Sequence, residues 1–247
     1  MNKKIKVAII GLGFGMEFIP IYQAHPNAEV YAVCRRNEEE LYKVGKRFNI
    51  RNLFINWKGL LDIEEIDAIH VVSPVSDHAE MALESLKANK HCACTVPMAT
   101  TIDDLVAIVN AKNKAKKVYM MMETAVYTRE FMYVKNLVDS GKLGRIQFLR
   151  GSHMQDMGLE GWPDYWLGFA PMWYGTHAIS PLLALADTKA GSVVCHGSGS
   201  ISKELAEKYG SPFAVETATF KLKDSNIIAE ATRSLYETVR QYRESLD

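Results

Sequence analysis

The sequence carries no excess of charge of either sign, few cysteines and no long apolar run. Its 29 basic residues balance 29 acidic ones, so no nucleic-acid partner is expected, because such binding needs a basic surface. The four cysteines lack the spacing of a zinc site or a disulfide framework, which favours reduced thiols in a cytoplasmic protein. No stretch is long and apolar enough to span a membrane.

Two further features are missing from the sequence. The lysines and apolar residues of the amino terminus resemble a secretory signal, but Glu17 and the lack of a small-residue cleavage site argue against one. The histidines and acidic residues show no close metal-ligand spacing, so we predict no metal. What remains is an ordinary globular composition in 247 residues, which is enough chain for two domains.

Short apolar runs alternate with amphipathic stretches in the first half of the chain. Strands are predicted at 6–10, 29–34, 67–73, 91–94 and 118–122, and helices at 14–25, 38–48, 78–89 and 102–115. This alternation is typical of right-handed crossovers in a parallel sheet. We therefore predict a doubly wound α/β domain over residues 1–123, with its ligand beyond the carboxyl ends of the strands.

The pattern changes after Glu123. The remaining chain is predicted to form helices at 131–140 and 176–186, a strand at 144–155, an aromatic loop at 156–172, and strands at 191–199, 213–223 and 226–234. Strands that follow one another in this way favour antiparallel pairing. We predict a second, α+β domain over residues 124–247 with a mostly antiparallel sheet.

A glycine-rich segment, GLGFGM, follows the first predicted strand and opens a helix. Gly11 permits the tight turn and Gly13 lets backbone N–H groups approach a pyrophosphate, so we predict that Gly11, Gly13, Phe14 and Gly15 contact a dinucleotide. Met16 stands where a third glycine or alanine is usual. The alternative is a glycine-rich turn with a structural role only.

The end of the second strand bears on which dinucleotide is bound. An acidic residue there would hold the ribose diol of NAD, but this chain has Arg35 and Arg36. Two guanidinium groups suit a 2′-phosphate and can stack on adenine, so the cofactor prediction is NAD(P), leaning to NADP. The alternative is that both arginines are simply solvated.

Several motifs together resemble the Gfo/Idh/MocA family of glucose–fructose oxidoreductases and inositol dehydrogenases. They are GLGFGMEF, SPVSDHAEMALESLKANKH, CTVPMATT, GKLGRI and YGTHAISP, in this order along the chain. The resemblance implies an N-terminal Rossmann domain, a C-terminal α+β domain, and oxidation or reduction of sugars with NAD or NADP. It also places Ser73, Pro74 and His78, with Val96 and Pro97, at the cofactor.

The sequence departs from this family at two polar positions. Family dehydrogenases usually read Glu-Lys-Pro where this chain has Thr95-Val96-Pro97, so the lysine that serves the reacting hydroxyl is absent. Trp173 replaces the usual aspartate four residues before His177, while the histidine is retained. Catalysis is therefore predicted to rest on Tyr174 and His177.

A second resemblance fits these substitutions better. NAD-dependent α-N-acetylgalactosaminidases of the same superfamily share the Val-Pro turn, a Met-Met-Glu segment followed by Tyr and Arg, and a Tyr-x-Thr-His motif. In them the cofactor oxidises the sugar at C3, elimination and addition follow, and the hydride returns. The resemblance implies that Tyr174 is the base at C2 and that His177 lies near the C3 hydroxyl.

Six further residues are predicted to line the substrate pocket: Glu123, Tyr127, Arg129, His153, Asp156 and Trp173. For Glu123 and Tyr127 the alternative is a hinge role, and for the aromatic residues it is packing. Three functions stay open, namely a sugar or glycoside oxidoreductase, a redox-neutral glycosidase-like enzyme, and a nucleotide-binding protein without catalysis. Because typical relatives are longer, we expect the second domain to be incomplete, and we expect a homo-oligomer formed through its sheet.

Overall fold

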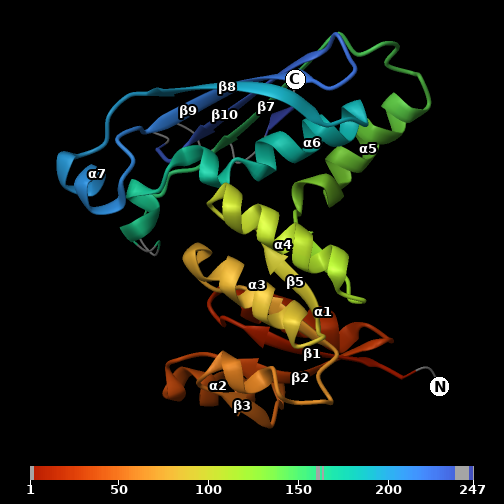
Figure 1. Cartoon of the computed structure of the whole chain (residues 1–247), viewed down its shortest axis with the longest axis vertical. Helices are drawn as coiled ribbons and strands as arrows, with labels where there is room; N and C mark the ends of the chain where they lie inside the picture. The colour runs from red at the N-terminus through yellow and green to blue at the C-terminus, as the bar shows by residue number, and fades with distance from the viewer. Residues whose placement is uncertain (1–2, 160–161, 163, 237–244, 247) are drawn as a thin grey trace. The chain divides into compact units, whose positions relative to one another are not determined.

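The computed structural model describes residues 3–159, 162, 164–236 and 245–246. The chain divides into two compact units, Met1–Met122 and Glu123–Asp247, whose elements are labelled in Figure 1. No helix in the described ranges is long and apolar enough to cross a membrane. Each unit has its own sheet and its own core, so each is described by itself.

The first unit is built on one six-stranded sheet with the order β3-β2-β1-β4-β5-β6. Its strands are β1 (Ile5–Ile10), β2 (Ala28–Cys34), β3 (Asn52–Phe54), β4 (Ala68–Val71), β5 (His91–Thr95) and β6 (Tyr119–Met122). Every neighbouring pair is parallel, which confirms the predicted doubly wound domain. The three-residue strand β3 was not predicted, because it is too short to show an alternating pattern.

The helices of this unit are α1 (Ile19–Ala24), α2 (Glu38–Phe48), α3 (His78–Lys87) and α4 (Ile102–Lys114). Asn37 and Thr101 cap α2 and α4 by accepting from the backbone N–H groups of Glu40 and Asp104, at 2.9 and 3.1 Å. The helix predicted from Phe14 instead starts as a 3₁₀ turn, η1 (Phe14–Phe18). Pro20 explains the restart, because it has no N–H to continue the ladder.

The core of the first unit lies on both faces of its sheet. Ala8 and Ile10 of β1 pack into one apolar cluster, whereas Val7 and Ile9 pack into the other. Such alternation follows from the period of two along a strand, and burial on both sides is typical of parallel sheets. Cys92 and Cys94 of β5 are both buried in the first of these clusters, as their spacing predicts.

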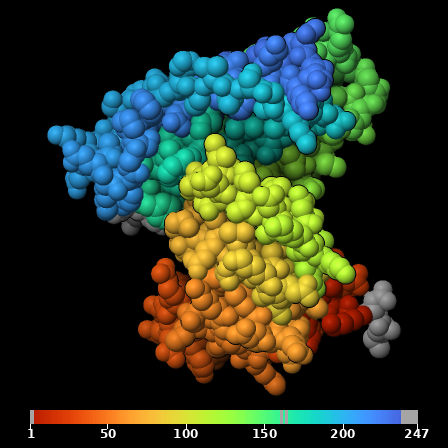
Figure 2. Space-filling view, viewed as in Figure 1, coloured from red at the N-terminus to blue at the C-terminus, as the bar shows by residue number. Residues whose placement is uncertain are grey.

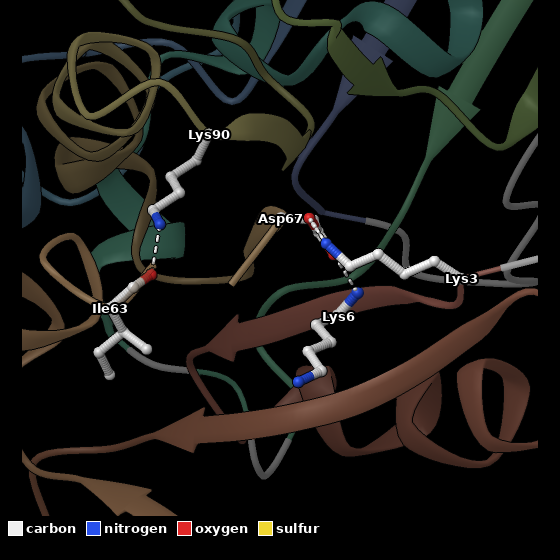
Figure 3. Close-up of polar contacts among 5 residues, drawn as sticks. All are labelled: Lys3, Lys6, Ile63, Asp67 and Lys90. Carbon is white, nitrogen blue, oxygen red and sulfur yellow. Dashed lines mark hydrogen bonds and ion pairs between the residues drawn. The ribbon is translucent and has the colours of Figure 1, made fainter. Parts of the chain in front are cut away.

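The amino ends of β1 and β4 are tied together by Asp67 (Figure 3). Its carboxylate accepts from the backbone N–H of Lys6 at 2.9 Å and lies 3.3 Å from Nζ of Lys3. Nearby, the ammonium group of Lys90 donates to the carbonyl of Ile63. These contacts lie at the opposite end of β1 and β4 from their carboxyl ends, so they leave the ligand-binding edge of the sheet open to other groups.

The second unit contains a five-stranded sheet with the order β11-β7-β10-β9-β8. Its strands are β7 (Phe148–Met154), β8 (Ala190–Ser198), β9 (Val215–Leu222), β10 (Ile228–Ser234) and β11 (Ser245–Leu246). The described pairs are antiparallel except β7 with β10, which confirms the predicted mostly antiparallel sheet. The helices are α5 (Arg129–Asp139), α6 (Thr176–Ala186) and α7 (Lys203–Tyr209), of which α7 was not predicted.

Helix α6 packs closely on the sheet of this unit. Ala178 and Leu182 are buried against Leu149 of β7 and the alanines of β10. Gly151 of β7 allows the approach, because a Cβ there would lie 2.5 Å from the carbonyl oxygen of Ala178. This contact brings the first turn of α6, which carries His177, over the carboxyl end of β7. The α6 bounds agree with the prediction.

Candidate functional site

In the first unit, the loops that carry the predicted cofactor residues gather at one edge of the sheet. They follow β1, β2, β4 and β5, which are neighbours in the order β2-β1-β4-β5 (Figure 1). Backbone bonds join them, since Gly11 N–H donates to the carbonyl of Cys34 at 3.0 Å and Val72 N–H donates to that of Ile10 at 2.8 Å. This is the edge at which doubly wound sheets bind ligands.

Two glycines of the loop after β1 differ in what they permit. Gly11 has φ +89°, and a Cβ there would lie 2.2 Å from the carbonyl oxygen of Val72, so the fold itself requires glycine. A Cβ on Gly13 would meet no atom within 4 Å, so packing within the chain does not require glycine there. Space of this kind beside a backbone suits close approach by a ligand, and it fits the predicted dinucleotide.

The predicted positions of the other loop residues are now defined. Phe14 is 64% exposed and Gly15 is buried against Ile9 and Val72. Arg35 is half-buried and Arg36 is exposed, directly after β2. Within the described part of the chain, neither guanidinium group forms an ion pair.

His78 connects the two remaining loops of this edge. Its ring is buried, with Nδ1 at 2.7 Å from the carbonyl oxygen of Pro97 and Nε2 at 2.9 Å from that of Ser73. The turn after β4, Ser73-Pro74, is thereby held against the turn after β5, where the Val96–Pro97 peptide is cis. The structure thus assigns the His78 side chain to the protein backbone, and its predicted contact with the cofactor stays a prediction.

In the second unit, Glu123 and His177 form a buried pair. Nδ1 of His177 lies 2.5 Å from Oε1 of Glu123, and the side chains are only 11% and 6% exposed. The same carboxylate oxygen accepts from the backbone N–H of Ala125 at 2.9 Å. Burial alone would raise the pKa of Glu123, but the hydrogen bond and charge of His177 together with the Ala125 N–H lower it below its usual value.

This pairing determines how the imidazole is held. An ionised Glu123 can only accept a hydrogen bond, so Nδ1 of His177 carries the hydrogen between them. A neutral His177 then has its lone pair on Nε2. A carboxylate behind a histidine orients the ring and stabilises its protonated form, as in other acid–base dyads. Such a geometry suits a general base. Glu123 contacts His177 directly, and its predicted place in the substrate pocket stays a prediction.

Two more predicted residues lie against this pair. The ring of Tyr174 in η6 (Pro171–Tyr174) is 5.2 Å from that of His177, and the ring of His153 is 5.0 Å from His177 and 5.8 Å from Tyr174. Trp166 packs edge-on against Tyr174 at 4.8 Å. Residues from β7, η6 and α6 therefore converge on one aromatic and imidazole cluster.

Arg233 of β10 is a member of this cluster that the sequence analysis did not select. Its side chain is fully buried, and its Cζ lies 5.8 Å from the centre of the Tyr174 ring. The guanidinium group donates through Nη1 to the carbonyls of His153, at 3.2 Å, and Ser234. A signal was present in the sequence, because Ala229, Ala231 and Arg233 share one face of an alternating strand and put a charge in a core position.

The remaining predicted residues lie nearer the surface. Tyr127 and Arg129 are exposed, at η4 (Ala125–Tyr127) and the start of α5. Trp173 is 44% exposed and packs on Phe169 at 5.2 Å. Asp156 is half-buried and accepts from the backbone N–H of Gly158 at 2.8 Å. Within the described ranges, no group of three or more His, Cys, Asp or Glu could hold a metal ion.

The comparison with protein families bears on the first unit. A family model described as "Oxidoreductase family, NAD-binding Rossmann fold" (GFO_IDH_MocA) matches residues 5–123. Residues 5–123 belong to the Gfo/Idh/MocA family. The sequence resemblance is thus confirmed, and the glycine loop and strand edge described above are those of a Gfo/Idh/MocA Rossmann domain.

Curated relatives extend the similarity beyond this Gfo/Idh/MocA domain. "Glycosyl hydrolase family 109 protein 1" of Bacteroides fragilis is 26% identical over 205 residues, which cover 76% of this chain and 44% of that protein. "Levoglucosan dehydrogenase" of Pseudarthrobacter phenanthrenivorans is 27% identical over 124 residues, or 50% of this chain and 32% of that one. The chain thus spans less than half the length of these relatives.

A solved structure titled "Levoglucosan dehydrogenase, complex with NADH and levoglucosan" matches 99% of this chain and 70% of its own length, with a TM-score of 0.85 and 20% identity. The match extends over both units. The second unit therefore shares its fold with that neighbour, and so does the Gfo/Idh/MocA domain. At this level of identity the match concerns the fold alone.

Proposed function

We propose that the protein is an NAD(P)-dependent oxidoreductase that acts on a sugar or glycoside by hydride transfer. The observation that carries the proposal is the buried Glu123–His177 pair beside Tyr174, in a chain whose other unit is an NAD-binding Rossmann domain. Relatives and neighbours named as sugar dehydrogenases support it. When bound, a nicotinamide dinucleotide supplies the hydride acceptor.

His177 performs the proton transfer in this proposal. A carbon can lose hydride only as the proton leaves its hydroxyl, and Nε2 of His177 accepts that proton. Glu123 keeps Nδ1 protonated and stabilises the imidazolium that results. The pair thereby replaces the lysine that family dehydrogenases carry where this chain has Val96.

A redox-neutral, glycosidase-like cycle is the second candidate function. It is supported by the Tyr174 ring beside His177 and by curated relatives named as glycosyl hydrolase family 109 proteins. In this cycle His177 serves the C3 hydroxyl and Tyr174 removes the C2 proton once C3 is oxidised, because a carbonyl acidifies the neighbouring C–H. Net oxidation does not require Tyr174, whereas elimination does.

Two variants separate these functions. We expect His177→Ala to abolish turnover of inositols, levoglucosan and p-nitrophenyl glycosides in both cases, with His25→Ala, at an exposed position after α1, as the matched control. Tyr174→Phe should spare net NAD(P)H production but stop glycoside cleavage. Near-normal turnover by His177→Ala, beside a fully active control, would refute the role of His177 in either function. Nucleotide binding by the unaltered chain, with no turnover of any of these substrates, would instead favour a nucleotide-binding protein without catalysis.

The cofactor preference is proposed to be NADP, since Arg35 and Arg36 follow β2 where an acidic residue would favour NAD. Replacing both with glutamine should weaken NADP binding by about tenfold or more and leave NAD binding nearly unchanged. Arg51→Gln, an exposed arginine of the same unit, is the control. Equal loss for both dinucleotides would contradict the preference.

We further propose a homo-oligomer formed through the second sheet, in a cytoplasmic protein. All nine residues of the edge strand β8 are exposed, including Val193 at 55% and Val194 at 59%, and Figure 2 shows the surface of this unit. An uncovered edge strand is a ready template for association. Light scattering should give a multiple of the chain mass, and substituting both valines with glutamate should give the single-chain mass. A monomeric starting protein would refute the proposal.

A further inference from the structure

Arg233 is completely buried, and among the described residues it forms no ion pair with a carboxylate. Its side chain has 0% relative exposure, and its Nη1 donates only to two backbone carbonyls, those of His153 and Ser234. Nε and Nη2 are buried with no hydrogen-bond partner in the described part of the chain. Buried arginines are normally paired with a carboxylate, because an uncompensated charge in the interior is costly.

Two acidic side chains of this unit are used elsewhere. Glu216 is opposite Arg233 in the β9–β10 register, but its carboxylate accepts from the backbone N–H of Met172 at 2.7 Å. Glu123 is bonded to His177 and Ala125. The ring of Tyr174 is the acidic side chain that lies against the guanidinium group, with Cζ 5.8 Å from its centre. A phenolate at Tyr174 would supply the missing negative charge.

We propose that Arg233 is a positioning residue that stabilises the phenolate of Tyr174 and so prepares this tyrosine to act as a base. The inference rests on the proposed function, because a base at Tyr174 matters only if a proton is removed there. It also supplies the cation that a tyrosine base needs. Arg129, the arginine predicted to line the substrate pocket, is exposed.

Titratable groups face Tyr174 from several elements. His153 of β7 and His177 of α6 lie 5.8 and 5.2 Å from it, ring centre to ring centre, and Arg233 of β10 lies against its face. Trp166 of η5 (Asp164–Gly168) contributes only an apolar wall. Glu123 lies behind His177, which its carboxylate contacts directly. Of these groups, the guanidinium group of Arg233 is the one placed over the face of the Tyr174 ring.

The ionisation of Arg233 is coupled to the charge of Tyr174. Burial lowers the pKa of Arg233 to about 10, and the charge of Tyr174 opposes this by raising it. Coupling between two groups is reciprocal, so a cation that is favoured by the phenolate must itself favour the phenolate.

The test measures the ionisation of Tyr174 in the full chain without sugar or added nucleotide. Tyrosine labelled with ¹³C at Cζ reports ionisation by NMR, and Tyr174→Phe identifies the resonance. We expect Tyr174 to ionise below pH 10, the value of an ordinary tyrosine, and to ionise about one pH unit or more higher in Arg233→Met. Arg233→Lys should restore most of the difference, and Arg150→Met, at a surface ion pair of β7, should cause none.

Two results would overturn the proposal. One is an unchanged ionisation of Tyr174 in Arg233→Met, a variant expected to fold because apolar residues often replace buried ions without loss of stability. The other result is seen in the unaltered chain: Tyr174 ionises at pH 10 or above, as an ordinary tyrosine does. If ionisation depends on Arg233 while every sugar assay fails, the proposed function falls and this inference stands. If sugar turnover is found but the ionisation of Tyr174 does not depend on Arg233, only this inference falls.

Discussion

Replacing Glu123 with glutamine tests whether the buried carboxylate holds His177 by its charge. The substitution keeps the size and one carbonyl oxygen but removes the charge from an acceptor of two hydrogen bonds, from His177 Nδ1 and Ala125 N–H. Hydrogen bonds to charged groups contribute about 1.5–3 kcal/mol and neutral ones about 0.5–1.5 kcal/mol. Two weakened bonds therefore predict a loss of roughly 2–3 kcal/mol in the free energy of unfolding at pH 7.

The effect of pH on this loss follows from the lowered pKa of Glu123. A carboxylate with a depressed pKa in the folded state contributes its stability in full above the unfolded pKa, about 4.3. The contribution is lost as the pH falls through the folded value. The difference between the unaltered chain and Glu123→Gln should therefore be largest at neutral pH and shrink once the pH drops below about 4.

Urea unfolding followed by tryptophan fluorescence measures this difference. Three of the four tryptophans, Trp162, Trp166 and Trp173, lie in the second unit, so the signal reports mainly on that unit. Glu130→Gln is the control, because Glu130 is exposed in the first turn of α5 and its loss should cost less than about 1 kcal/mol. A Glu123→Gln penalty no larger than the control, or one that is constant from pH 7 to pH 3.5, would refute the reasoning.

Three further predictions concern other parts of the fold. Gly11→Ala should lower the free energy of unfolding of the first unit by roughly 3 kcal/mol or more, because Gly11 has a positive φ and lies against the Val72 carbonyl. Gly13→Ala should leave the free energy of unfolding unchanged and weaken nucleotide binding in titration calorimetry. His78→Ala should destabilise the first unit by about 2–4 kcal/mol in urea unfolding, since two buried carbonyl contacts are lost, and a cost below 0.5 kcal/mol would contradict the assigned role. In the single-chain form of the Val193→Glu, Val194→Glu variant, one thiol, that of Cys195, should react rapidly with a disulfide reagent, because the other three cysteines are buried. Fast reaction of a second thiol would contradict their burial.

Much of the fold was predictable from local patterns along the chain. The alternation of apolar runs indicated a parallel sheet in the first unit, and Asn37 and Thr101, each directly before a helix, are of the residue types that cap helices. These features depend on residues within one or two turns of each other. Helix α7 escaped prediction because it is short and none of its residues is buried, so it shows no apolar face.

The candidate site was predictable only as a set of residues. The motifs singled out Tyr174, His177 and Glu123, and the glycine loop was evident from its place after the first strand. Which groups touch could not be read from the sequence. Glu123 and His177 are 54 residues apart, and Arg233 is 80 residues from the carbonyl of His153 that it contacts.

The physical reason lies in the register of the second sheet. Alternation along β10 indicates that Ala229, Ala231 and Arg233 share a face, but not which residues of β7 and β9 lie beside them. That choice is made when α6 packs over Gly151 and the strands align. The sequence by itself determined the Rossmann pattern, the caps and the residue types of the site. The tertiary structure decided that a carboxylate supports the histidine and that a buried guanidinium group lies against the tyrosine.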